Sequence, residues 1–156
     1  MSDAAYDAQE VARLSTEEMW RGDAASRMLG MTVAEVGPGT AVVTMTVRED
    51  MVNGWGSCHG GILATLADSA FAVACNSRGT VTVGAGFDIT ILAPAALGDA
   101  LVATARERAL RGRSGVYDVT LTRAGGEGAA GEVVAEFRGR SRSLGRPNPG
   151  LGQAQD

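Results

Sequence analysis

The stretch from Asn53 to Asn76, NGWGSCHGGILATLADSAFAVACN, constrains the fold of this chain more than any other part of the sequence. After His59 and two glycines, apolar residues occupy nearly every side of a helical wheel, which predicts a helix buried in a core. That helix contains one acid, Asp68. A carboxylate is costly to ionise in a core unless it is hydrogen-bonded or used in chemistry, so Asp68 is the first candidate for a functional residue.

Strand patterns lie on both sides of this helix. The segments MTVAEV and TAVVTMTV, separated by a Gly-Pro-Gly turn, have the β-branched content of a hairpin. Four more strands are predicted after the helix, near 80–92, 98–111, 115–123 and 131–143. Their short connections favour antiparallel neighbours. Together these elements predict an α+β fold in which an antiparallel sheet curls around the helix.

The two ends of the chain lie outside this pattern. Residues 4–29 are predicted to be a helical lead-in, with Ser15 and Glu18 at capping-box spacing and Asp23 capping a further short turn. From Gly145 on, the sequence has two prolines and no apolar period, which predicts disorder. A chain of 156 residues fits one domain. The boundaries we expect are 1–144 for a single domain and 145–156 for a disordered tail.

All 14 positive residues are arginine, and the absence of lysine excludes Schiff-base chemistry, pyridoxal phosphate attachment and a P-loop lysine. The net charge of −4 argues against a nucleic-acid partner, whereas the basic stretch 100–146 leaves room for a small phosphorylated ligand. No apolar run approaches the roughly 18 to 20 residues of a membrane span, and the acidic N-terminus is unlike a signal peptide. We therefore expect a cytoplasmic protein with no membrane partner.

The small and polar residues of the predicted helix share one sector of the wheel. They are Gly61, Thr65, Asp68, Ser69, Ala72 and Asn76. Two interpretations of Asp68 follow from this stripe. Either its carboxylate only accepts hydrogen bonds from neighbouring hydroxyls, or it takes part in chemistry.

His59, Gly60 and Gly61 stand where the helix begins. Backbone N–H groups at a helix start, together with the positive end of the macrodipole, can hold a developing oxyanion, although the same residues also serve as a simple cap. Cys58 is a poor candidate for a nucleophile activated by His59, because the side chains of adjacent residues rarely point at one another. Cys58 and Cys75 match neither a disulfide framework nor a metal-ligand spacing, so we expect free thiols and no metal.

The spacing between these two candidate groups limits how they can act together. Gly60 and Asp68 are eight residues apart in the sequence, which is roughly 12 Å along one helix. Asp68 cannot act on a carbonyl held at the start of its own helix. If both groups act on one substrate, they come from two chains.

Arginines recur with period two along the predicted strands, which places each set on one face. Most of these, such as Arg106 and Arg138, are expected on a solvated surface. Arg111 and Arg113 flank a glycine turn that ends in Ser114. Backbone N–H groups and guanidinium groups converge there, so this turn is the better phosphate contact.

The motif Asn53-x-x-Gly56-x-x-His59-Gly60-Gly61 followed by Asp68 resembles the hotdog-fold acyl-CoA thioesterases, in particular the phenylacetate-degradation branch. The resemblance continues through LADSAFAVACNSRG, FDITILAPAALGD, GRSGVYDVTL and FRGRS, and so covers roughly residues 15–143. The related 4-hydroxybenzoyl-CoA enzymes carry a glutamate and, one turn later, a threonine. Asp68 and Ala72 stand at those positions here, which favours the phenylacetate type.

The resemblance implies roles for individual residues. Asp68 would be the general base or nucleophile, the Gly60 N–H would polarise the thioester carbonyl with help from His59, and Asn53 would orient the water or the carboxylate. The residues expected to bind substrate are Gly61, Arg111, Arg113, Ser114 and Arg140. No metal or bound cofactor is expected, because the CoA thioester is the substrate. The expected assembly is a homodimer with shared active sites, in a homotetramer of two dimers. The alternative is a non-catalytic acyl-CoA-binding hotdog dimer.

Overall fold

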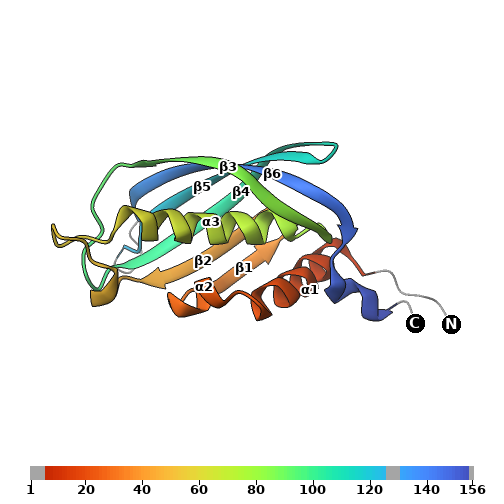
Figure 1. Cartoon of the computed structure of the whole chain (residues 1–156), viewed down its shortest axis with the longest axis horizontal. Helices are drawn as coiled ribbons and strands as arrows, with labels where there is room; N and C mark the ends of the chain where they lie inside the picture. Colours follow the sequence, from red (N-terminus) through yellow and green to blue (C-terminus); the bar gives the residue numbers. More distant parts are fainter. Residues whose placement is uncertain (1–5, 126–130, 155–156) are drawn as a thin grey trace.

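The computed structural model describes residues 6–125 and 131–154. A six-stranded antiparallel sheet curls around one long helix, α3 (Gly60–Asn76), as Figure 1 shows. In spatial order the strands are β1 (Thr32–Gly37), β2 (Thr40–Thr46), β4 (Ala100–Arg111), β5 (Ser114–Arg123), β6 (Glu132–Pro147) and β3 (Thr80–Ile91). A short 3-10 helix, Glu49–Met51, precedes α3. The predicted α+β class and all six strands are confirmed.

The core lies between α3 and the concave face of the sheet. Phe71 of α3 packs edge-on against Tyr117 (5.5 Å between ring centroids) and at a tilt against Phe137 (5.8 Å). Gly139 of β6 lies under the same ring, where an added Cβ would come within 2.8 Å of it. The other side of α3 differs from the prediction of burial all round, because Ile62, Thr65, Asp68 and Ala72 are only partly buried in this chain.

The N-terminal lead-in forms two helices, α1 (Ala8–Arg21) and α2 (Ala24–Met28). Asp23 caps α2, as predicted, by accepting a hydrogen bond from the Ser26 N–H. The predicted capping box at Ser15 is wrong, because Asp7 caps α1 and Ser15 is buried within that helix. Residues 4 and 5 of the predicted lead-in lie outside the described residues.

The segment after Gly145 is ordered where the structure describes it, which differs from the predicted disorder. β6 continues to Pro147, and a 3-10 helix follows at Pro149–Ala154. Asn148 is 3% exposed and donates a hydrogen bond to the Ser15 carbonyl oxygen (3.2 Å). A buried side-chain amide therefore fixes this segment to α1, which a hydrophobic pattern does not reveal. Residues 155–156 lie outside the described residues.

Within the described ranges, none of the helices has both the length and the apolar character needed to cross a bilayer.

Candidate active site

Asp68 lies in the middle of α3 and faces an open cleft of about 530 Å³ between α3, β3 and α1. The cleft walls include Met19, Phe71, Asn76, Gly84 and Phe87. Gly84 keeps this space open, since an added Cβ would lie 3.3 Å from the Phe71 ring and 4.0 Å from Asp68 Oδ1. The site thus joins a carboxylate to an apolar, partly aromatic wall.

The hydroxyls nearest Asp68 are committed to other partners. Thr65 donates to the Gly61 carbonyl oxygen (2.8 Å), and the Ser69 hydroxyl bonds to that of Ser26 (2.8 Å). Asn76 donates to the carbonyl oxygen of Thr82 (2.8 Å). Among the described residues, none donates a hydrogen bond to the Asp68 carboxylate. The interpretation that neighbouring hydroxyls hold Asp68 is therefore wrong.

The surroundings of Asp68 make its carboxylate more basic. Burial raises its pKa first, and the negative charge of Asp23 raises it further. A carboxylate without donors, with a raised pKa and open access from a cleft, is suited to take a proton or attack a carbonyl carbon.

The N-terminus of α3 is built by His59. The His59 Nδ1 accepts a hydrogen bond from the Gly61 N–H (3.0 Å). The backbone N–H of His59 donates to the Met51 carbonyl oxygen (2.8 Å). The capping interpretation of His59 is confirmed. The Gly60 N–H has no acceptor within the described part of the chain, and it lies near Ile91 of β3. Gly60 is therefore free to donate to a ligand, whereas the Gly61 N–H is occupied.

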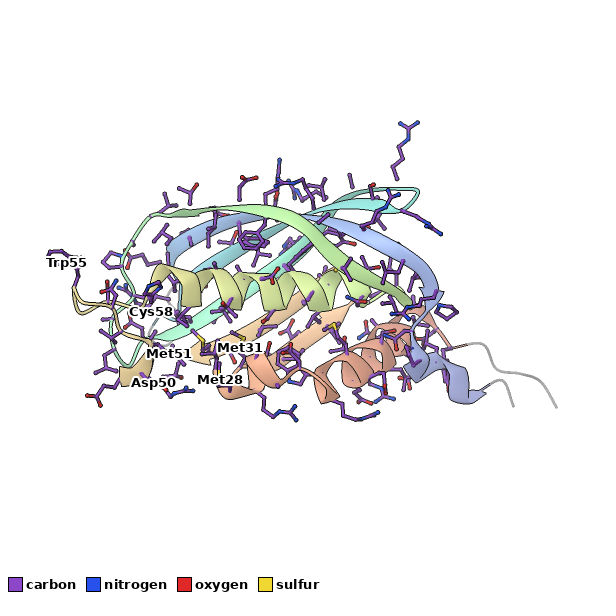
Figure 2. All side chains as sticks on the ribbon, viewed as in Figure 1. Met28, Met31, Asp50, Met51, Trp55 and Cys58 are labelled. Atoms are coloured by element: carbon purple, nitrogen blue, oxygen red, sulfur yellow. The ribbon has the colours of Figure 1, made fainter. Side chains whose placement is uncertain are left out.

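Asn53 organises the loop before α3. Its Oδ1 accepts hydrogen bonds from the N–H groups of Trp55 (2.9 Å) and Ser57 (3.2 Å). Asn53 and Gly60 line a second cleft of about 290 Å³, which shares no lining residue with the Asp68 cleft. Figure 2 shows Trp55 projecting from the tip of this loop, where its side chain is 95% exposed.

Neither cysteine is placed for chemistry. Cys58 and Cys75 are buried free thiols. Burial raises the pKa of the Cys58 thiol, which disfavours its nucleophilic thiolate. In the parts of the chain that the structure describes, no group of three or more His, Cys, Asp or Glu side chains could hold a metal ion.

The candidate phosphate ligands lie in two places. Arg111 and Arg113 are exposed at the β4–β5 turn, and neither forms an ion pair among the described residues. Ser114, in the same turn, accepts a hydrogen bond from Arg142 (3.3 Å), a residue that sequence reasoning did not select. Arg140 lies instead against Gly86 at the rim of the Asp68 cleft.

The predicted site residues therefore separate into three groups along α3. Asn53, His59, Gly60 and Gly61 lie at its start, Asp68 and Arg140 near its middle, and Arg111, Arg113 and Ser114 near its end. The glycines that open the Asp68 cleft were not predicted. Their signal is the sequence Gly-Ala-Gly inside a strand, a pattern typical of a close approach by another group.

The geometry agrees with comparisons to known proteins. A model of the thioesterase superfamily matches residues 56–130. The acyl-coenzyme A thioesterase PaaI of Escherichia coli (strain K12) is 43% identical over 127 residues, which cover 81% of this chain and 87% of that protein. Human acyl-coenzyme A thioesterase 13 is 35% identical over 115 residues, covering 72% of this chain and 79% of that protein.

Solved structures agree with this relationship. The Escherichia coli PaaI protein from the phenylacetic acid degradation operon superposes with a TM-score of 0.84 and 40% identity, over 90% of this chain and 99% of that chain. A Streptococcus mutans UA159 protein bound to acetyl CoA gives a TM-score of 0.69 and 26% identity, over 75% of this chain and 90% of that chain. The chain has the hotdog fold and belongs to the thioesterase superfamily. Within it, the chain falls among the acyl-CoA thioesterases similar to PaaI.

Proposed function

We propose that this enzyme hydrolyses a small acyl-CoA, with an aryl or arylacetyl acyl group, to the free acid and CoA. The observation that carries the proposal is the Asp68 carboxylate, which faces an open cleft and receives no hydrogen bond from the described residues. Phe71 and Phe87 give that cleft an aromatic wall. The similarity to PaaI, a protein of a phenylacetic acid degradation operon, supports the same acyl class.

Asp68 can act in either of two ways. As a general base it takes a proton from water, which then adds to the thioester carbonyl carbon; as a nucleophile it attacks that carbon itself and forms an anhydride that water opens. In both routes the carbonyl oxygen becomes negative and the CoA thiolate leaves. The Gly60 N–H and the positive end of α3 stabilise this oxyanion. The side-chain nitrogen of Asn53, which has no acceptor among the described residues, orients the water or the carboxylate.

These groups complete one site only if two chains meet. Gly60 and Asp68 line separate clefts of the same chain. β3 borders both clefts, and it is an edge strand of the sheet. An edge strand with exposed apolar side chains is suited to pair with another chain. Val83, Phe87 and Ile91 are such side chains, each between 43% and 47% exposed.

One register of that pairing would join the two halves of the site. A two-fold axis between Phe87 and Asp88 places Gly84 of one β3 opposite Ile91 of the other, because both lie equally far from the axis. Gly84 adjoins Asp68, and Ile91 adjoins Gly60. The pairing therefore brings the base of one chain to the oxyanion donor of its partner. A tetramer of two such dimers stays a prediction from the resemblance, and the cytoplasmic location stays a prediction from the sequence.

The CoA phosphates are assigned to arginines. Arg113 is the leading candidate and Arg111 the next, because neither is neutralised by an acid among the described residues. Arg142 joins them through its contact with Ser114. Arg140 is the weakest candidate, because it already forms a 2.6 Å ion pair with Asp88.

Two measurements test the proposal. The first is release of free thiol from a panel of small aryl and aliphatic acyl-CoA substrates. The second mixes Asp68→Asn chains with Gly60→Pro chains after joint unfolding and reassembly. Proline removes the N–H but suits the first position of a helix, and the ψ of 133° at His59 is allowed before proline. A Cβ at position 60 lies 2.9 Å from the flexible end of Ile91 in either variant, so Gly60→Ala, which has this contact but keeps the N–H, is the matched control and should stay active.

Each mutant alone should be nearly inactive, because both sites of its homodimer lack the same group, either the Asp68 carboxylate or the Gly60 N–H. A mixed dimer has one intact and one doubly damaged site, so activity should return to about half of wild type per mixed dimer. Mixed dimers that are confirmed by mass but stay inactive would refute the shared site. Tight acyl-CoA binding without thiol release from any substrate would instead support the non-catalytic alternative.

A further inference from the structure

Asp23, at the junction of α1 and α2, is tied to α3 through two serines. Its carboxylate accepts hydrogen bonds from the Ser26 N–H (2.9 Å) and from the Ser26 hydroxyl (2.7 Å). The Ser26 hydroxyl also meets the Ser69 hydroxyl at 2.8 Å. Because the one hydroxyl proton of Ser26 goes to Asp23, Ser69 is the donor in that second bond. The chain of bonds therefore runs from α3 to the Asp23 carboxylate, starting at the residue next to Asp68.

The bond between the two serines is shielded from water, whereas the Asp23 carboxylate is partly exposed. Ser26 is 1% exposed and Ser69 is 8% exposed. Hydrogen bonds that end on a carboxylate are stronger than neutral ones, and they are stronger still away from solvent. Asp23 is therefore held in a fixed position relative to α3.

We propose that Asp23 is a positioning residue, a fixed negative charge that the Ser26 and Ser69 hydroxyls hold against the helix carrying Asp68. The inference rests on the proposed function, in which Asp68 is the base or nucleophile. Asp23 does not line the Asp68 cleft, so it acts through Asp68 and not on the substrate. Its negative charge makes ionised Asp68 less stable and therefore more basic.

Other groups around Asp68 offer no comparable charge. The cleft is lined by uncharged residues, such as Met19 of α1 and Phe87 of β3. At its rim, the charges of Arg140 and Asp88 are paired with each other. α3 itself adds the Cys75 thiol, whose pKa burial and Asp68 together raise to about 12, so that it stays neutral. β4 and β5 add Glu107 and Tyr117, which bond to each other, while Glu107 is paired with Arg78. Asp23 is the acid whose charge acts on Asp68 among the described residues.

The test is the pH profile of Asp23→Asn. Asparagine caps a helix as well as aspartate does, so this change removes the charge and keeps the bond from the Ser26 N–H. The new side-chain NH2 takes the place of Oδ2 and donates to the Ser26 hydroxyl, which then donates to Ser69. The acid limb of kcat/KM follows ionisation of the base in the free enzyme. Losing a neighbouring negative charge lowers the pKa of Asp68, so the midpoint should move to lower pH. Activity relative to the plateau should then rise about 3- to 10-fold well below the wild-type midpoint.

Asp7→Asn is the matched control. Asp7 caps α1 in the same way, accepting a hydrogen bond from the Glu10 N–H (2.8 Å), and its substitution should leave the profile unchanged. An Asp23→Asn profile that superimposes on wild type, or that moves to higher pH, overturns the inference. If Asp23→Asn does not fold, Asp23→Ser, another uncharged N-cap, carries the same expectation.

A second readout separates this inference from the proposed function. If the wild type hydrolyses no thioester, the proposed function fails, but the effect of Asp23 on Asp68 is still measurable. The Asp68 carboxyl carbon, assigned by comparison with Asp68→Asn, should titrate by NMR at a lower pH in Asp23→Asn than in wild type. An unchanged midpoint overturns the inference.

Discussion

The two clefts along α3 differ in how completely their own chain satisfies their polar groups. At the helix start, the Asn53 Oδ1 and the His59 Nδ1 accept hydrogen bonds that shape the loop and the cap, and the polar groups left without a partner among the described residues are N–H donors. At the middle of the helix, Asp68 receives no hydrogen bond from the described residues, although Thr65 and Ser69 are close in sequence. One region is therefore arranged by local bonds, whereas the other keeps a basic group unpaired.

Under the proposed function, this difference gives the two regions different duties. A pre-formed loop and cap hold one backbone N–H in place at no further cost when the oxyanion forms. An unpaired carboxylate with a raised pKa is costly in the resting protein but is ready to take a proton. Under the proposed function, the helix start is the rigid electrostatic element and Asp68 is the reactive one, and the predictions below test each of them.

The largest expected effect is on turnover when Asp68 is replaced. Asp68→Asn keeps the shape but removes the base, so thioester hydrolysis should fall about 10²- to 10⁴-fold in kcat. Thiol release under saturating substrate measures this change. Asp50→Asn, at an acid that is paired with Arg48 and 69% exposed, is the control and should be fully active. Near-normal turnover by Asp68→Asn would remove Asp68 from the mechanism.

The next effect is on dimerisation through the proposed β3 contact. Val83→Glu places a carboxylate on the apolar edge of β3, where the proposed dimer would bury it. An unpaired buried charge costs several kcal/mol, so the dimer dissociation constant should rise about 100-fold or more. Sedimentation or light scattering reports the mass. Met28→Glu, on α2 and 68% exposed, should leave the assembly intact. A Val83→Glu protein that stays dimeric would place the interface elsewhere.

A smaller effect is expected where substrate phosphates would bind. Arg113→Ala should raise KM for acyl-CoA about 2- to 5-fold at low salt, because an exposed charge contact contributes modestly. The difference from wild type should shrink as ionic strength increases, since salt screens exposed charges. Arg106→Ala, at an exposed arginine on β4, serves as the control. A KM that responds neither to salt nor to Arg113→Ala would exclude this phosphate site.

The smallest effect is on stability. The pKa of Asp68 is raised in the folded state, so its ionisation at neutral pH costs stability that is present in acid and lost as pH rises through the folded pKa. Asp68→Asn should therefore raise Tm at pH 7 by about 1 to 3 °C, a small gain because solvent screens a half-exposed group. The gain should vanish near pH 3, below the ordinary pKa of aspartate of about 3.9. A lower Tm for Asp68→Asn at pH 7 would contradict a raised pKa.

Much of the fold could be predicted because its signals are local. The apolar pattern after His59 gave the central helix, and period-two patterns gave the strands to within a few residues. Capping was predicted less well. Asp23 was identified correctly, but Ser15 was mistaken for a cap because capping-box spacing also occurs within a helix.

The candidate site was only partly predictable. Asp68 was selected because an acid in an apolar helix is rare. The distance to Gly60 predicts a site shared by two chains if both groups act on one substrate. The polar stripe around Asp68 was less informative than it looked, since Ser69 turns to α2 while Asp68 faces β3. Which neighbour each of these side chains faces depends on elements that are far apart in sequence, and a helical wheel does not show those elements.

The sequence by itself determined the helix, its single acid, the cap at its start and the order of the strands. These follow from periodicity and from hydrogen bonds between residues a few positions apart. Only the tertiary structure decided which hydroxyls bond elsewhere, that Gly84 opens the cleft, and that Asp23 reaches α3 through Ser26. The physical reason is range. A hydrogen bond or a close backbone approach between distant segments exists only after the sheet has closed around the helix.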